Sequence, residues 1–210
     1  MSARFNASSR RLAASSSVSS SFVGLAMVII LPHTITLDHL PDGHLRGVGL
    51  VAISWAFLEG AIERIVWRAA GLDENRGIAI TTHTNIQTRL DAAKTLLNKF
   101  FPNSKPAKQL KSLDKHIRKI LMPLRNEIVH SRIVALDLHS DPLRVVYKAR
   151  GELKREPIPI KLEEYETVSK QILAAANKAR EIYSDVFALI QKQDRLAVDL
   201  HIRGDEPHAP

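Results

Sequence analysis

The sequence predicts an all-α protein, a four-helix bundle with a small β-hairpin inserted before its last helix. Three observations predict this fold. Four long stretches carry apolar residues at helical spacing, one short stretch before the fourth alternates instead, and glycine, proline and polar clusters separate them. The 210-residue length suits one ordinary domain.

The composition of the chain excludes several classes of functional site. The chain has no cysteine, which excludes disulfides, thiolate metal sites and cysteine nucleophiles, and we expect it to be cytoplasmic. A formal net charge of +8 favours a polyanionic partner. No stretch approaches the roughly 20 apolar residues that span a bilayer, so we expect no membrane span and place nucleic acid ahead of membrane.

The N-terminal residues differ from the rest. Arg4, Arg10 and Arg11 lie in a serine-rich stretch without acidic residues, and an apolar run follows at residues 22–31. This pattern is typical of a targeting segment, or of a wrongly assigned start with Met27 as the true initiator. We expect residues 1–26 to be a disordered extension, residues 45–192 to form the helical domain, and residues 193–210 to be a flexible tail.

The first two helices are expected at residues 45–72 and from Thr82 or Thr84 to residue 100, with Gly71 near the first stop and residues 73–82 as a loop. Trp55, Phe57 and Trp67 are interpreted as core aromatics. The expected inner positions of these helices are Leu50, Ile53, Phe57, Ile62, Ile65 and Val66, then Ile86, Leu90, Ala93, Leu96 and Leu97.

The third helix is expected at residues 106–133 and the fourth at residues 162–193. Between them, residues 133–160 alternate around a turn at Ser140, Asp141 and Pro142, which predicts the hairpin. The third helix has a core stripe of Leu110, Leu113, Ile117, Ile120, Leu121, Leu124 and Ile128.

A basic ridge lies opposite that stripe on a wheel of about 100 degrees per residue, and its members are Lys108, Lys111, Lys115 and Lys119. The same wheel places Asn126 in line with Lys108 and His130 about 40 degrees further round. Pro123 removes a helical hydrogen bond and is expected to change this phase. The alternative is a solvated face ending in Arg and His residues that suit a helix C-terminus.

The end of this helix reads Arg125-Asn126-Glu127-Ile128-Val129-His130. It resembles the R-x4-6-H signature of the HEPN superfamily (higher eukaryote and prokaryote nucleotide-binding), whose members often carry a polar residue directly after the arginine. Other Arg and His pairs stand at permitted spacings, at residues 76 and 83, 132 and 139, and 195 and 201, without that polar residue. The position late in a third helix also matches, and the resemblance covers residues 45–192.

The resemblance implies a metal-independent RNA endonuclease of a toxin or defence-like kind. Such proteins act as homodimers in which two motifs meet in one composite site. His130 would transfer protons at the ribose 2′-OH or the leaving 5′-oxygen, Arg125 would stabilise charge on the phosphate, and Asn126 would orient His130 or bind the phosphate. The products would be a 2′,3′-cyclic phosphate and a 5′-OH, with no cofactor or metal. The RNA backbone would follow Lys108, Lys111, Lys115 and Lys119.

The resemblance also bears on partners. Some toxins of the superfamily pair with a nucleotidyltransferase antitoxin that modifies a tyrosine two residues after the histidine. This sequence has Arg132 there, so that mode of control does not match. The remaining histidines lack metal-ligand spacing, and Glu59 and Glu63 are interpreted as surface carboxylates rather than counterions of Arg125.

Two other functions remain open from the residues. The first is a catalytically inactive HEPN-like module that binds RNA, nucleotide or a protein partner, with Arg125 and His130 in a structural hydrogen-bond network. The second is a helical scaffold that docks on a membrane surface through its N-terminal segment and basic residues.

Overall fold

The computed structural model describes residues 40–130, 132–134, 142–149 and 153–204. The chain divides into two compact units, residues 1–35 and 36–210, and everything described belongs to the second. The expectation for residues 1–26 therefore lies outside the described residues. The elements are α1 (Asp42–Ala69), α2 (Glu74–Thr81), α3 (Ile86–Phe100), α4 (Lys105–His116), the π-helix η2 (Ile117–Leu121), α5 (Met122–His130), β1 (Arg132–Val134), β2 (Leu143–Ala149), β3 (Leu153–Pro159) and α6 (Leu162–Gly204).

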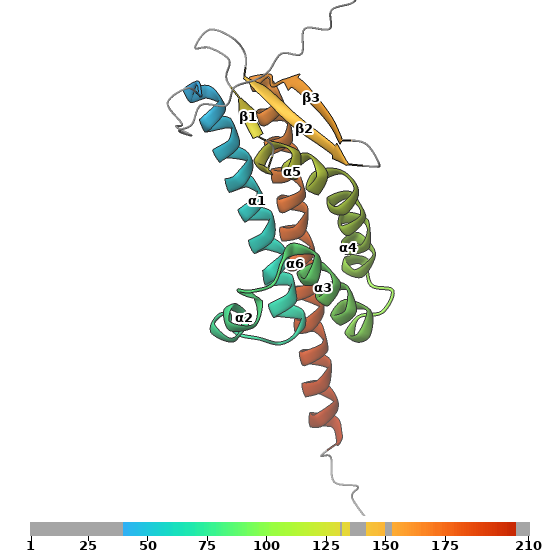
Figure 1. Cartoon of the computed structure of the whole chain (residues 1–210). Helices are drawn as coiled ribbons and strands as arrows, with labels where there is room; N and C mark the ends of the chain where they lie inside the picture. Colours follow the sequence, from blue (N-terminus) through green and yellow to red (C-terminus); the bar gives the residue numbers. More distant parts are fainter. Residues whose placement is uncertain (1–39, 131, 135–141, 150–152, 205–210) are drawn as a thin grey trace, which may run out of the picture. The chain divides into compact units, whose positions relative to one another are not determined.

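The second unit is mostly helical, as predicted. Its two longest helices, α1 and α6, run side by side, α3 and α4 pack against them, and α5 packs on α1 beside the small sheet (Figure 1). Burying one apolar stripe from each helix provides most of the driving force for this arrangement. The largest fully buried side chains are Tyr165, Leu58, Ile62, Ile65, Leu90, Leu97, Leu110, Ile117, Leu121, Ile160, Ile172 and Ile182.

Helix α1 ends at the predicted stop. Gly71 adopts a left-handed φ of 68°, and the backbone N–H groups of Gly71 and Leu72 donate to the carbonyls of Arg68 and Trp67 at 3.2 and 2.9 Å. This is the glycine cap that satisfies the last free carbonyls of a helix. Gly71 is suited to it because it has no Cβ to oppose a positive φ.

The predicted inner face of α1 is wrong at three positions. Leu50, Ile53 and Phe57 are 40, 57 and 52% exposed, whereas Val51, Trp55 and Leu58 are buried. Both sides of the helix carry apolar residues in this stretch, so the periodicity alone could not say which side faces α6 and α3. Phe57 is therefore not a core aromatic, while Trp55 is.

A short helix replaces the loop expected at residues 73–82. Helix α2 begins after Asp73, whose side chain accepts from the backbone N–H of Arg76 at 3.0 Å. The next helix, α3, begins after Asn85 rather than Thr82 or Thr84. The Asn85 side chain accepts from the backbone N–H of Thr88 at 2.9 Å, a strong N-cap that satisfies a free donor.

The expected third helix is interrupted by a π-helical turn. Its α4 and α5 segments are joined by η2, in which the backbone N–H of Met122 donates to the carbonyl of Ile117, five residues back. Pro123 follows directly, and it cannot donate to the carbonyl four residues before it. A π turn next to the proline absorbs this missing bond. The helix ends at His130 rather than residue 133, because Arg132–Val134 pairs as a strand.

The predicted hairpin is a three-stranded antiparallel sheet in the order β1-β2-β3. Strand β2 pairs with β3 from Leu143 opposite Pro159 to Ala149 opposite Leu153. The short β1 adds Arg132 opposite Val145. The predicted turn at Ser140 and Asp141 lies outside the described residues. The final helix, α6, begins at Leu162 as expected but continues to Gly204, past residue 193.

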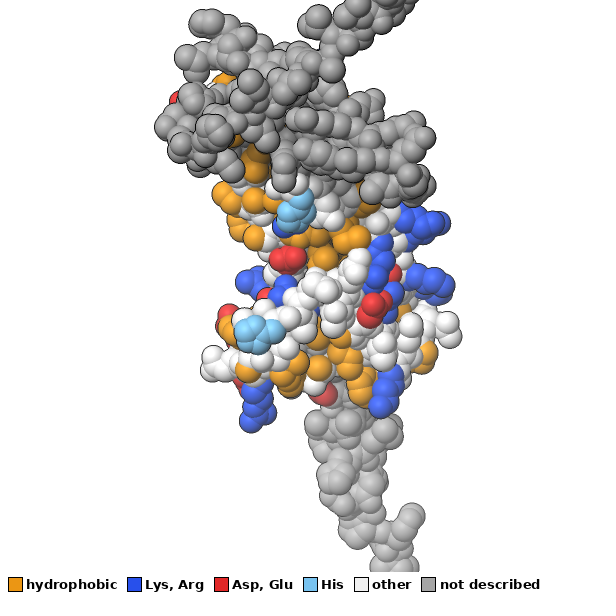
Figure 2. Space-filling model, viewed as in Figure 1, with side chains coloured by type: hydrophobic (Ala, Val, Ile, Leu, Met, Phe, Trp, Pro, Cys, Tyr) orange, Lys and Arg blue, Asp and Glu red, His pale blue; other side chains and the backbone are white. Residues whose placement is uncertain are grey.

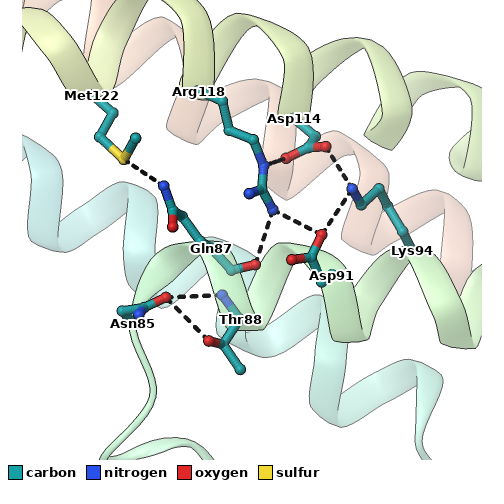
Figure 3. Close-up of polar contacts among 8 residues, drawn as sticks. All are labelled: Asn85, Gln87, Thr88, Asp91, Lys94, Asp114, Arg118 and Met122. Carbon is teal, nitrogen blue, oxygen red and sulfur yellow. Dashed lines mark hydrogen bonds and ion pairs between the residues drawn. The ribbon is translucent and has the colours of Figure 1, made fainter.

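Charged side chains join α3 to the α4–η2 segment (Figure 3). The buried Asp114 binds Lys94 Nζ at 2.7 Å and also Arg118 Nε, and Asp91 contacts both cations at 2.9 and 2.8 Å. The hydrogen bond with Asp114 raises the pKa of Lys94 and of Arg118, and the bond from Lys94 lowers the pKa of Asp91. These pairs fix α4 on α3.

Within the described residues, α1 has the length and apolar composition that could cross a membrane. Its buried side packs on α6 and α3, as does that of a core helix in a soluble bundle.

Candidate functional site

The three residues of the Arg125 to His130 motif meet at the C-terminal end of α5. One guanidinium nitrogen of Arg125, Nη1, lies 2.7 Å from His130 Nε2 and donates to Asn126 Oδ1 at 3.1 Å. Asn126 and His130 are exposed, and Arg125 is half-buried. The arrangement places an imidazole and an amide each within hydrogen-bond distance of one cation, at an exposed helix end.

The contact between Arg125 and His130 defines the state of the imidazole. A guanidinium has donors only, so His130 Nε2 must be the acceptor. Accepting this bond requires the imidazole tautomer that carries its proton on Nδ1. The lone pair of His130 Nε2, which could accept a proton, is then engaged by Arg125 Nη1.

Arg125 is held from the other side by α1. Its guanidinium carbon lies 5.7 Å from the centre of the Trp55 ring, within the range of a cation–π interaction. Trp55 is 5% exposed, and its indole N–H donates to Glu59 Oε1 at 2.9 Å. Arg125 Nε is buried and has no hydrogen-bond partner among the described residues. Trp55 thus positions the arginine, a role that the sequence did not reveal.

The two glutamates of α1 have structural partners. Glu63 accepts from the Thr81 hydroxyl and lies 3.6 Å from Arg89 Nη2, which ties α1 to α2 and α3. Its side chain is 18% exposed, so the interpretation of Glu63 as a surface carboxylate is wrong. The Trp55 indole engages Glu59, as described above.

The lysine ridge is exposed but does not run in line with the motif. Lys108, Lys111 and Lys115 lie on α4 and Lys119 lies in η2. A π turn takes in one more residue than an α turn, so the residues after η2 are rotated back by roughly 100 degrees. The π turn thus changes the phase between Lys108 and Asn126 next to Pro123, where the sequence predicted a change.

The surface over α4 carries charges of both signs. Figure 2 shows basic side chains, with acidic ones among them, along the side where α4 runs in Figure 1. Asp91 and Asp114 belong to this region through their ion pairs with Arg118. The region where α4 packs on α3 therefore carries charges of both signs.

Two pockets lie elsewhere on the described surface. One, of about 480 Å³, lies between α4 and α6 and includes Gln109, His116 and Lys178. The other, of about 270 Å³, includes Arg64, Arg68 and Tyr183. Neither includes a motif residue. Across the described residues, no three histidine, aspartate or glutamate side chains gather as ligands of a metal ion would.

Comparisons of the chain with family models, with curated proteins and with solved structures found no match.

Proposed function

We propose that this chain is a metal-independent RNA endonuclease of HEPN type, toxin- or defence-like in role, whose active residues are Arg125, Asn126 and His130. The observation that carries the proposal is the contact of Arg125 with both His130 and Asn126 at an exposed helix end. These side chains offer a base, a cation and a polar orienting group in one place, which is what cleavage of RNA without a metal requires.

The phosphate of the substrate would free the base. A phosphodiester is a stronger partner for a guanidinium than a neutral imidazole is, because two charged groups form shorter and stronger hydrogen bonds. Binding of phosphate by Arg125 therefore releases His130 Nε2 from its 2.7 Å contact. Asn126, one turn before His130, can hold the ring or a phosphate oxygen.

The chemistry then follows from the freed imidazole. His130 Nε2 takes the proton of the ribose 2′-OH, the 2′-oxygen forms a bond to phosphorus, and the bond from phosphorus to the 5′-oxygen breaks. The 5′-oxygen leaves with a proton, so the products are a 2′,3′-cyclic phosphate and a 5′-OH. Arg125 stabilises the extra negative charge on the phosphate oxygens during this step.

A homodimer with a composite site completes the proposal. Each chain contributes one motif histidine, so a second copy of the motif would supply the acid that protonates the 5′-oxygen. The exposed lysines Lys108, Lys111, Lys115 and Lys119 would bind the RNA backbone further from the reacting bond. An antitoxin protein remains among the partners proposed for this class, although Arg132 provides no hydroxyl for transfer of AMP.

A second candidate is a catalytically inactive module that binds RNA, nucleotide or a protein. The packing of Arg125 over Trp55 favours it, because this contact alone gives the arginine a structural role. The two candidates differ in one respect: a binding module keeps RNA intact.

The test is incubation of the purified full chain with total RNA in EDTA. We expect cleavage whose new 5′ ends accept phosphate from polynucleotide kinase without prior dephosphorylation. His130→Ala should abolish cleavage, whereas His83→Ala, a matched change of an exposed histidine outside the motif, should not. RNA that stays intact but is retained by the wild-type protein would support the binding module instead. Equal cleavage by both variants would exclude the proposed site.

A further inference from the structure

The outer side of α1 is apolar and uncovered in the second unit. Leu50, Ile53 and Phe57 are 40, 57 and 52% exposed, and Figure 2 shows hydrophobic side chains exposed where α1 runs in Figure 1. A contiguous apolar patch of this kind on a soluble protein marks an interaction surface. We call the α1 outer face the set of exposed or half-buried positions Gly49, Leu50, Ile53, Ala56, Phe57 and Gly60.

Large and small residues alternate on the α1 outer face. A Cβ added at Gly49 or Gly60 would meet no other atom within 4 Å, so both glycines border open space. Beside them stand the projecting side chains of Leu50, Ile53 and Phe57. A helix surface with projections next to depressions is the form that another helix surface can fit.

The charges at the ends of the α1 outer face have opposite signs. On a wheel of about 100 degrees per residue, Asp42 and Arg64 fall on the same side of α1 as Ile53, one near each end of the helix, and Arg46 lies between Asp42 and the apolar stripe. All three are exposed. An antiparallel copy of α1 would therefore bring a negative end to a positive end.

We propose that the α1 outer face binds a second copy of this chain, with the two α1 helices antiparallel and the two-fold axis at Ile53. In this register Phe57 of one copy is level with Gly49 of the other, and Leu50 is level with Ala56. On a wheel of about 100 degrees per residue, Leu50 and Phe57 of both copies fall on one side of the seam. Asp42 lies opposite Arg64, and Arg46 lies opposite Gly60. Leu50 and Phe57 of the two copies therefore pack on one side of the seam, the small residues lie on the other side, Ile53 meets its own copy, and no like charges are opposed. This is the self-complementarity that a two-fold interface requires.

This interface is separate from the Arg125 site. Trp55, which carries Arg125, is buried on the side of α1 away from Ile53. The α1 dimer therefore leaves both motifs open to solvent and does not itself bring them together. The inference stands independently of RNA cleavage, and its test uses no RNA.

The test uses the absence of cysteine from the chain. Ile53→Cys introduces a single thiol on the proposed axis, where it lies opposite its own copy. We expect mild oxidation of the full chain to give a disulfide-linked dimer. Ile80→Cys is the matched control, because Ile80 is also an exposed isoleucine, 60% against 57%, but lies on α2. Equal cross-linking of the two variants, or none for Ile53→Cys, would overturn the proposal.

A second pair of variants measures the affinity. In sedimentation analysis, Ile53→Lys should raise the dissociation constant of the dimer at least about tenfold, while Ile80→Lys leaves it unchanged. Thermal unfolding reports whether each variant is folded, which we expect because both positions are exposed.

Other occupants of the α1 outer face give different results. A wild-type chain that is monomeric at about 100 µM would overturn the proposal. If that monomer instead sediments with phosphatidylcholine and phosphatidylserine vesicles, and the Ile53→Lys variant does not, the α1 outer face binds a lipid surface. A monomer that binds no vesicles would overturn the proposal and would indicate that another part of the chain covers the α1 outer face.

Discussion

Substitution of Gly47 tests the close approach of α1 to Tyr165 of α6. A Cβ at Gly47 would lie 2.5 Å from Cγ and Cδ2 of Tyr165, a ring that is 1% exposed and contacts His44 Nδ1 through its hydroxyl at 3.3 Å. The ring is therefore enclosed and cannot move aside freely. Gly60, on the same helix, is the matched control because its Cβ would meet nothing within 4 Å.

The expected magnitudes follow from two opposing effects. Replacing a helical glycine by alanine stabilises a helix by roughly 0.5–1 kcal/mol, and this gain applies at both positions. At Gly47 the added methyl also overpacks the contact with Tyr165, which costs about 1–3 kcal/mol. We therefore expect Gly60→Ala to raise the free energy of unfolding, and Gly47→Ala to lie about 1–3 kcal/mol below Gly60→Ala.

Urea unfolding followed by circular dichroism measures both variants. The protein concentration must be the same throughout, because any dimer links stability to concentration. Tyr165→Leu should reduce the penalty of Gly47→Ala in the double variant, since the two residues are in contact. Equal stabilisation by Gly47→Ala and Gly60→Ala would refute the close approach of α6 to α1.

Two further predictions concern the ion pairs between α3 and α4. Asp114→Asn should lower the free energy of unfolding by about 1–3 kcal/mol, because it leaves Lys94 and Arg118 without their buried partner. Asp91→Asn should lower it less, since the Asp91 side chain is 59% exposed. A larger loss for Asp91→Asn in urea unfolding would contradict the proposed role of the buried Asp114. The pKa of Asp91 is held below its ordinary value of 3.8 by the hydrogen bond from Lys94, so its stabilisation is present above pH 3.8 and lost as the pH falls through the lower folded pKa. The stability difference between wild type and Asp91→Asn should therefore shrink on acidification, and a difference that grows would be inconsistent with this sign.

Much of the helical layout could be predicted from the sequence. The apolar stripe of the third helix predicted the burial of Leu110, Ile117 and Leu121, but it was wrong at Ile120, which lies in the π turn and is 46% exposed. Gly71 marked the end of the first helix. These features are local: each depends on spacing along one helix or on the φ of one residue. Local patterns of this kind are readable without knowledge of the tertiary structure.

The wrong predictions depend on tertiary contacts. Helix α2 buries no large apolar side chain, since Ile78 and Ile80 are exposed, and it is held by bonds of Thr81 to Trp67 and Glu63. The exposed side of α1 was misread because Leu50, Ile53 and Phe57 have the spacing of a core stripe. The direction of burial is set by where α6 lies, and spacing along α1 contains no information on that.

The candidate site was predictable in part. Arg125, Asn126 and His130 belong to one helix, so their meeting follows from a single run of residues. The aromatic partner Trp55 belongs to α1 and was interpreted only as a core residue. Pro123 predicted a change of phase between the lysine ridge and the motif but not its size, because the π turn beside it is not visible in the residue spacing.

The central claim concerns His130 as the base that cleaves RNA. The most direct measurement is the single-turnover rate of cleavage of one labelled RNA oligonucleotide in EDTA, together with its binding. The proposed function predicts that His130→Ala lowers the rate by about 10²–10⁴-fold, the usual contribution of a general base, while the affinity for the oligonucleotide changes little. An unchanged rate in His130→Ala, or no cleavage by the wild-type protein, would contradict it.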